Sequence, residues 1–182
     1  MRDESKKRLL QIARQGLEAA VTRRPPPAIK EDDPELLVER GIFVTLKNGD
    51  ALRGCLGVFS SDKPLCRLVG EMAAASAKDD PRFRAHPITP AELPAISIEI
   101  SVLSPLERVA NPLDLELGKH GICIESGWAS GCFLPQVATE TGWSKEEFLT
   151  HCCAGKAGLA PDAWKSPDTK VYLFTAEVFG DA

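Results

Sequence analysis

Residues 52–59 decide the fold, and they read Leu52-Arg53-Gly54-Cys55-Leu56-Gly57-Val58-Phe59. The composition is that of a β-strand, in which successive side chains point to opposite faces of the sheet. One face therefore carries Arg53, Cys55 and Gly57, and the other carries apolar side chains that predict a core contact. The first face holds a cation roughly 6–7 Å from a thiol. Gly57 has no side chain, so we expect it to leave open space above the sheet.

Cys55 has two interpretations. A nearby cation lowers the pKa of a thiol, and a thiolate is both a nucleophile and a metal ligand. Arg53 and Cys55 together are therefore typical of a reactive site. Cysteine is also among the residue types most often buried, where it packs as a small hydrophobic side chain. The residues alone leave both interpretations open.

A β-hairpin is predicted around this strand. Residues 41–46 form another strand-like run, and Asn48-Gly49 between the two runs is a strong turn signal. A two-residue turn would put Val44 on the face of Cys55. A three-residue loop, with Gly49 in the left-handed conformation, gathers the apolar side chains on one face, and burial of that face favours this loop. The apolar face then consists of Ile42, Val44, Leu46, Leu52, Leu56 and Val58.

Further helices and strands are predicted from the hydrophobic pattern. Apolar periodicity indicates helices over residues 3–21, 64–78 and 135–142. A capping box of Ser144 and Glu147 starts another helix, which ends at Gly155 or Gly158. Strands are predicted over residues 95–103, 120–124, 130–134 and 171–179. Strands outnumber helices and the hairpin turns favour antiparallel pairing, so the predicted fold class is α+β with two sub-halves.

Two further charged sites lie outside the hairpin. A residue before proline is pushed out of the helical conformation, so residues 79–83 form a tight turn that carries Asp80 and Arg82. Glu99 lies in the middle of a strand, where a carboxylate is disfavoured. Either solvent exposure or pairing with Arg53 across the same sheet would explain Glu99.

Length and composition limit the classes of function. The chain has 182 residues, of which 43% are hydrophobic and 26% charged, as in soluble globular proteins of one domain or two small halves. The net charge of −4 disfavours a dedicated nucleic-acid binder. No early apolar run resembles a signal peptide, and nothing approaches the roughly 20 residues of a membrane span. We therefore expect a cytoplasmic protein with no membrane or nucleic-acid partner.

The six cysteines predict neither a disulfide framework nor a metal centre. Without a secretory signal they are expected to be reduced thiols. No Cys-x-x-Cys pair occurs, and His151-Cys152-Cys153 has no second ligand cluster at zinc-site spacing. Their spacing gives no support to a redox or metal role, so no metal and no cofactor is expected.

Motifs spread over the chain make it similar to one protein family. With residues 52–57 they include Phe43-Val44-Thr45-Leu46, Asp80-Pro81-Arg82-Phe83, Ile98-Glu99-Ile100-Ser101-Val102-Leu103-Ser104-Pro105, His120-Gly121, Leu134-Pro135-Gln136-Val137, Trp143, Lys156-Ala157-Gly158-Leu159 and Trp164. On these motifs the chain resembles the AMMECR1 family, the A component of the AmmeMemoRadiSam system, over nearly its whole length. It departs mildly from the family pattern at Leu56 and Val58, where isoleucine and threonine or serine are common.

The resemblance implies a fold and a cellular context but no reaction. The implied fold is one α+β domain over residues 1–182, with mainly antiparallel strands, packed helices and two interleaved subdomains. The subdomains are expected to divide near residue 110, with a cleft between them. The implied context is a cytoplasmic component found alongside Memo-like and radical-SAM proteins, whose biochemical activity is unassigned.

The favoured function is that of a ligand- or partner-binding component. The strand and the turn over residues 79–83 would form a recognition groove for a small anionic ligand or a protein partner, and Cys55 would be a packing residue. The residues that would form this groove are Arg53, Gly54, Gly57, Asp80 and Arg82.

The alternative function is an enzyme that transfers a group on a small acidic substrate. Cys55 would be the nucleophile and His120 the base. Glu99 would orient that base or pair with Arg53. This alternative is less favoured because a lone histidine at the end of a strand is more often structural.

Overall fold

A computed structural model describes residues 1–181, and these residues form two compact units. Residues 1–103 and 177–181 make up unit 1, and residues 104–176 make up unit 2. Each unit has its own hydrophobic core and its own four-stranded sheet. The α+β class predicted from the sequence is confirmed.

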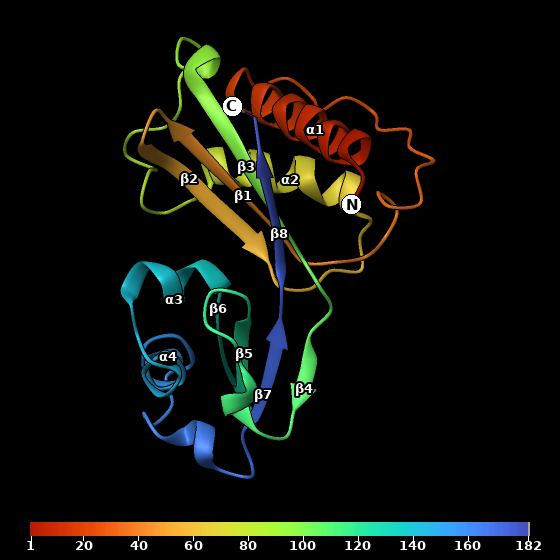
Figure 1. Ribbon diagram of the computed structural model, residues 1–182. Coiled ribbons are helices and arrows are strands. Elements are labelled where there is room, and N and C mark those ends of the chain that lie inside the picture. The colour runs from red at the N-terminus through yellow and green to blue at the C-terminus, as the bar shows by residue number, and fades with distance from the viewer. Residues whose placement is uncertain (182) are drawn as a thin grey trace. The chain divides into compact units, whose positions relative to one another are not determined.

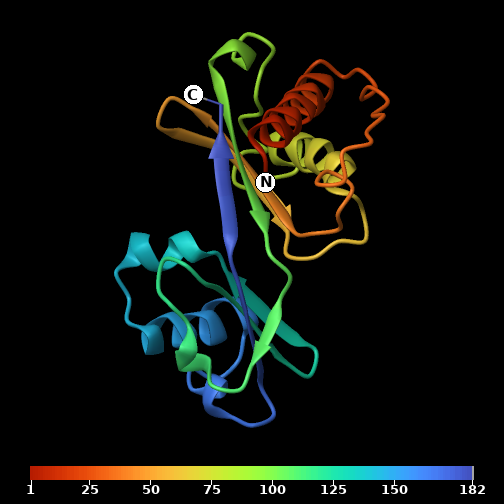
Figure 2. The ribbon, with the colours of Figure 1, turned by 45° about the vertical axis from the view of Figure 1, so that its right-hand side comes forward.

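Unit 1 is a sheet with two helices packed on one face (Figure 1). Its strands follow the order β2-β1-β3-β8, so β2 lies at one edge. The elements are α1 (Asp3–Val21), β1 (Ile42–Asn48), β2 (Ala51–Val58), α2 (Leu65–Lys78), β3 (Ile96–Leu103) and β8 (Ala176–Gly180). Figure 2 shows α1 and α2 side by side on the same side of this sheet. The core of unit 1 lies between these helices and the sheet.

The core of unit 1 follows from the two periodicities in the sequence. Alternate residues of β1 and of the first half of β3 are buried, and the fully buried ones include Ile42, Val44 and Leu46. The helical stripe that faces them includes Leu9 and Leu17 of α1, both without solvent exposure. The apolar side chains that recur every second residue in the strands therefore pack against those that recur every 3.6 residues in the helices, and together they form one apolar layer.

The β1–β2 hairpin keeps the predicted faces over residues 54–58, but a β-bulge changes them next to the turn. Val44 lies opposite Leu56, so the two share a face as expected, and Gly49 has a φ of 57°. The predicted three-residue loop is wrong, because Asn48 lies opposite Ala51 and only residues 49 and 50 lie between them. The register shifts between Leu46 and Lys47, so Leu46 lies opposite Gly54 whereas Lys47 lies opposite Leu52. The placement of Leu52 on the apolar face is therefore wrong, because a bulge inserts one extra residue and changes the alternation beyond it.

Unit 2 is a second antiparallel sheet with helices, and its strand order is β4-β7-β5-β6. Its strands are β4 (Glu107–Val109), β5 (Gly121–Ser126), β6 (Ala129–Phe133) and β7 (Lys170–Phe174). Its α-helices are α3 (Pro135–Thr141) and α4 (Lys145–Cys152). The predicted capping box is confirmed: Ser144 Oγ accepts from the N–H of Glu147, and the Glu147 carboxylate accepts from the N–H of Ser144. A short π-helix (Cys153–Ala157) follows α4, and Gly158 caps it with a φ of 67°.

Two sequence expectations are corrected by unit 2 and its connection to β8. The single strand expected over residues 171–179 is wrong, because β7 and β8 are separate strands in different sheets. Cys123 and Cys132 form a disulfide, so the expectation of six reduced thiols is wrong for these two. They are directly opposed on β5 and β6, with their Cα atoms 4.1 Å apart, which is within reach of a disulfide.

Among residues 1–181, none of the helices combines the length and the apolar character needed to cross a membrane.

Candidate functional site

Gly54 allows α2 to approach the edge strand β2 closely. A methyl group at Gly54 would overlap the carbonyl oxygen of Ser76 on α2. The Ser76 hydroxyl also accepts a hydrogen bond from the N–H of Leu56 and donates one to the C=O of Val44. The helix is therefore bonded to both strands of the hairpin. Gly54 belongs to this packing and faces the core side of the sheet.

The chain turns back to β2 directly after α2, and Asp80 makes the connection. The backbone N–H of Cys55 donates to Asp80 Oδ2 at 2.9 Å. The backbone C=O of Cys55 accepts from Arg82 Nη2 at 3.4 Å. An edge strand presents unpaired N–H and C=O groups, and at Cys55 both are bonded to the turn over residues 79–83.

The Asp80 carboxylate is buried and fully bonded. Its side chain is 1% exposed, and Arg82 donates to it from both Nε and Nη2, at 3.0 and 2.7 Å. The N–H groups of Arg82 and Cys55 supply two more hydrogen bonds. The Arg82 hydrogen bonds, and then those from the two backbone N–H groups, lower the pKa of Asp80 to about 2 despite its burial. Asp80 is therefore a fixed anion that positions Arg82, and not a proton acceptor near neutral pH.

Arg82 combines a fixed position with an accessible charge. Its side chain is 56% exposed, and its guanidinium also lies 5.5 Å from the centre of the Phe83 ring. The fork geometry of a bidentate arginine pair orients the whole guanidinium plane. Asp80 and Phe83 thus hold a cation at the edge of β2 with part of its surface in solvent.

The Cys55 sulfur lies on the face of the sheet opposite the helices. The hydroxyl of Thr45, its cross-strand neighbour, is 3.2 Å from the sulfur and in hydrogen-bonding geometry. Thr45 in turn lies opposite Glu99 on β3. Cys55, Thr45 and Glu99 thus form a row across three strands, and the outer two are separated by two strand spacings, or about 10 Å. Glu99 is paired with Lys47 at 3.4 Å.

Arg53 pairs with Glu92 and not with Glu99. Its guanidinium lies 3.1 Å from Glu92 Oε1 and also donates to the backbone C=O of His86 at 3.2 Å. Arg53 has no Cα partner on β1, because it occupies the bulge. Hydrogen bonds from Thr89, and then the charge of Arg53, lower the pKa of Glu92. Arg53 thus ties the strand to residues 86–92.

Gly57 does not leave open space above the sheet, so that expectation is wrong. A methyl group at Gly57 would collide with the ring and backbone of Phe43, the residue opposite it on β1. The Phe43 ring also packs edge-on against Phe59, with ring centroids 4.9 Å apart. The close approach of the β1 backbone at Ile42 and of the Phe43 ring, and not an opening, explains the glycine at this position.

His120 belongs to unit 2, whereas Cys55, Glu99, Asp80 and Arg82 belong to unit 1. Its Nδ1 accepts a hydrogen bond from the N–H of Glu116 at 2.9 Å. That bond leaves Nε2 as the nitrogen available to other groups. The pairing of His120 with Cys55 stays a prediction.

Three residues of the site were absent from the sequence-based candidates. Ser76 and Thr45 carry hydroxyls that bond the hairpin, and Glu92 holds Arg53. The sequence could have indicated that Glu92 is fixed in place, because Thr89-x-x-Glu92 has the spacing of a capping box. In the structure Glu92 accepts hydrogen bonds from both the N–H and the hydroxyl of Thr89. Ser76 had a weaker one, as a polar residue inside the alanine-rich stretch of α2. Within residues 1–181, no group of three or more His, Cys, Asp or Glu side chains is arranged to hold a metal ion.

The fold and this site define a class of protein: an α+β protein of two units with an arginine–carboxylate turn bonded to an edge strand that carries Cys55. The AMMECR1 family profile matches residues 10–179. The chain therefore belongs to the AMMECR1 family.

Proteins similar in sequence to this chain occur in archaea. A protein of Methanothermobacter thermautotrophicus is 43% identical over 185 residues, covering 98% of this chain and 94% of the relative. Protein TK0174 of Thermococcus kodakarensis is also 43% identical, over 190 residues and 91% of its length. The crystal structure of the uncharacterized protein PH0010 from Pyrococcus horikoshii is similar in fold, with a TM-score of 0.87 and 40% identity over all of this chain and 93% of that one.

Proposed function

We propose that this protein is a ligand- or partner-binding component that works with Memo-like and radical-SAM proteins in one pathway. The binding surface is the edge of β2 at Cys55 together with the turn over residues 79–83. It takes an anionic group, either of a small ligand or of an acidic side chain on a partner. The protein acts in the cytoplasm.

The observation that carries this proposal is the pairing of Asp80 with Arg82. A buried carboxylate with four hydrogen bonds fixes the guanidinium, which is itself more than half exposed. Recognition of carboxylates and phosphates favours arginine held in a fixed orientation, because less side-chain freedom is lost on binding. Arg82 Nη1 makes none of these bonds and is available to an anion.

The acid–base properties of unit 1 support binding over independent catalysis. A general base works best with a pKa near the operating pH. The pKa of Asp80 is about 2 and that of Glu92 is also lowered, so neither carboxylate near the hairpin is suited to that role. Glu99 forms an ion pair with Lys47.

The test is binding between purified proteins. The affinity of this chain for the Memo-like and radical-SAM proteins of the same organism is measured by surface plasmon resonance, for wild type, Arg82→Gln and Arg84→Gln. Arg84 is the matched control, because it is an exposed arginine in the same segment that donates only to the backbone C=O of Asp79. We expect Arg82→Gln to weaken binding about tenfold or more, and Arg84→Gln to leave it unchanged.

A second measurement tests anion recognition in the wild-type protein, so its result does not depend on whether Arg82→Gln folds. Inorganic phosphate is titrated into the wild-type protein while the backbone N–H signals of residues 80 and 82–84 are followed by NMR. We expect phosphate to shift these signals and to compete with the partner. Equal affinity of Arg82→Gln and wild type, together with no phosphate effect, would contradict the proposal.

The enzyme alternative rests on the contact between the Thr45 hydroxyl and the Cys55 sulfur. Such a contact suits a reactive sulfur as well as a packed one. The rate of Cys55 alkylation is followed against pH by mass spectrometry, with buried Cys152 as reference, whose pKa burial raises to about 12. Labelling of Cys55 that is fast well below pH 8.5, the value of a free thiol, would favour a nucleophile. Labelling only on unfolding would exclude it.

A further inference from the structure

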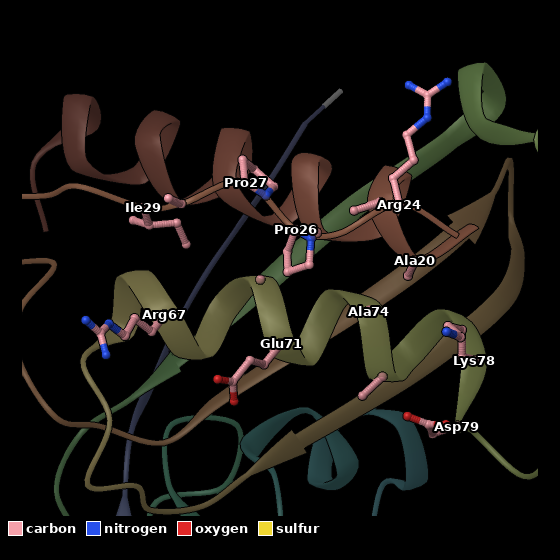
Figure 3. Close-up of a pocket in the computed structure, with 15 residues that line it drawn as sticks. Ala20, Arg24, Pro26, Pro27, Ile29, Arg67, Glu71, Ala74, Lys78 and Asp79 are labelled. Carbon is pink, nitrogen blue, oxygen red and sulfur yellow. The ribbon is translucent and has the colours of Figure 1, made fainter. Parts of the chain in front are cut away.

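A hollow in unit 1 lies between α1, α2 and the segment over residues 24–29 (Figure 3), and Asp79, which precedes Asp80 in the chain, is at its edge. Its volume is about 690 Å³, within the range of small-molecule sites. The floor consists of the small residues of two helices, and the third side is the proline-rich segment with Pro26, Pro27 and Ile29. All of its lining residues belong to unit 1.

Two glycines set the depth and shape of this hollow. Gly16 of α1 faces Gly70 of α2, and a methyl group at Gly16 would overlap the Gly70 backbone. The helices therefore touch at their backbones here. Further along the two helices the residues are Ala20 and Ala74, whose side chains are too short to fill the space. The result is an apolar trough.

The rim of the hollow carries cations that have no counter-ion. Within residues 1–181, the charged groups of Arg24, Arg67 and Lys78 make no hydrogen bond or ion pair, whereas the nearby Glu71 is already paired with Lys63 at 2.7 Å. Figure 3 shows Arg24 and Lys78 at the same end, near the C-termini of α1 and α2, and Arg67 at the other. Eleven residues of helix separate Arg67 from Lys78, which is about 16 Å.

Two cations at one end balance the negative groups there, and a third makes the end positive. Those groups are the Asp79 carboxylate and the partial charges of the two helix C-termini. Arg23 adds a third cation, in a second hollow that also contains Ala20 and Lys78. Arg23 has a φ of 56°, at a helix end where glycine is usual. The guanidinium of Arg23 adds positive charge beside the hollow, which a glycine at this position would not supply.

We propose that this hollow binds an amphipathic organic anion, with its carboxylate or phosphate at Arg24 and Lys78 and its apolar body over the Gly–Ala floor. The walls favour such a ligand over an acidic peptide. Prolines 25–27 have no N–H to donate, and the N–H and C=O groups inside α1 and α2 are bonded within each helix. A peptide backbone would therefore lose its water here without gaining partners, whereas a hydrocarbon chain needs none.

The probe for this proposal is decanoate, compared with decyltrimethylammonium and acetate by isothermal titration calorimetry on the full chain. The tryptophans all lie in unit 2, so a heat signal is preferable to intrinsic fluorescence. We expect decanoate to bind one molecule per chain, with the cationic amphiphile and acetate at least about fivefold weaker. Equal or tighter binding of decyltrimethylammonium would overturn the proposal.

Variants then locate the site. Arg24→Gln with Lys78→Gln is expected to weaken decanoate about fivefold, whereas Lys7→Gln, which removes an exposed and unpaired α1 cation outside the hollow, leaves it unchanged. Asp79→Asn is expected to strengthen it, because a repelling charge is lost. Ala74→Leu fills the floor and should abolish binding with an unchanged far-UV spectrum.

The outcomes that would contradict this site are equally specific. An unchanged affinity in the Arg24→Gln, Lys78→Gln double variant would remove Arg24 and Lys78 from the site, even if Ala74→Leu failed to fold. Binding of an acidic heptapeptide without binding of decanoate would mean that the hollow binds a protein partner instead. Arg82→Gln should retain full decanoate affinity, so failure of this site and failure of the proposed function are distinguishable.

Discussion

Asp80 is the residue whose chemistry most constrains the site, because its charge is buried and completely bonded. Its pKa of about 2 in the folded protein lies below the value of about 3.9 for an unfolded aspartate. The unfolded state therefore binds more protons between these two pH values. The stabilisation is fully present above about pH 5 and is lost as the pH falls from about 4 to about 2. The difference between the two pKa values corresponds to about 2.5 kcal/mol.

Asp80→Asn should therefore destabilise unit 1 at neutral pH but hardly at all near pH 2. We expect a loss of about 2 kcal/mol at pH 7, since charged hydrogen bonds to a buried group are removed. Hydrogen exchange at the Cys55 amide is a direct readout, because that N–H donates to Asp80. Asp79→Asn is the control, since Asp79 is exposed and adjacent. A difference between Asp80→Asn and wild type that stays constant from pH 7 to pH 2.5 would show that the carboxylate charge is not responsible.

For single residues, the sequence predicted which face of the sheet a side chain occupies, but not which residue it pairs with. Alternation along the strands correctly put Val44 and Leu56 on one face and Cys55 on the other, and the strand that carries Glu99 lies in the same sheet. It could not show that the carboxylate reaching Arg53 comes from Glu92, because alternation carries no information on which loop lies over a strand edge. The bond from Asp80 to Cys55 depends on where α2 ends, which is likewise a tertiary property.

At the scale of elements, the approach of α2 to β2 depends on a single glycine. Gly54→Ala would drive a methyl group into the Ser76 carbonyl, which is backbone and cannot rotate away. We expect a loss of about 3 kcal/mol in the free energy of unfolding, at the upper end for an overpacked core, measured by urea denaturation. Gly155→Ala is the matched change, with no atom within 4 Å of the added methyl. Similar stability of the two variants would mean that α2 shifts easily along the sheet.

The two mispredicted features have different causes. Residues 171–179 are apolar enough to suggest one strand, but Thr175 lies between β7 and β8, and its N–H is bonded to the Ser104 hydroxyl at the other connection between the units. The hairpin bulge was missed because a shift of one residue leaves the hydrophobic pattern of residues 54–58 intact and changes only Leu52 and Arg53. Local patterns predict elements well where one face is uniformly buried, and poorly where the chain changes sheets.

At the scale of the whole molecule, the two separate cores predict two separable unfolding events. Reporters for each are already present: the three tryptophans lie in unit 2, and the buried Cys66 thiol lies in unit 1. Gly54→Ala should lower the urea concentration at which Cys66 becomes labelled and leave the tryptophan transition unchanged. Reduction of Cys123–Cys132 should do the opposite, with a loss of about 2–3 kcal/mol expected for a disulfide that closes a loop of this length.

The control for this last prediction is the Cys123→Ser, Cys132→Ser double variant. Its tryptophan transition should match that of the reduced wild type and should not respond to reductant. Labelling of Cys66 is read separately from the other thiols by mass spectrometry, so the two transitions can be followed in one experiment. If Gly54→Ala moved both transitions by the same amount, folding of unit 2 would depend on unit 1. The two chain crossings at residues 103–104 and 176–177 would then transmit stability from one core to the other.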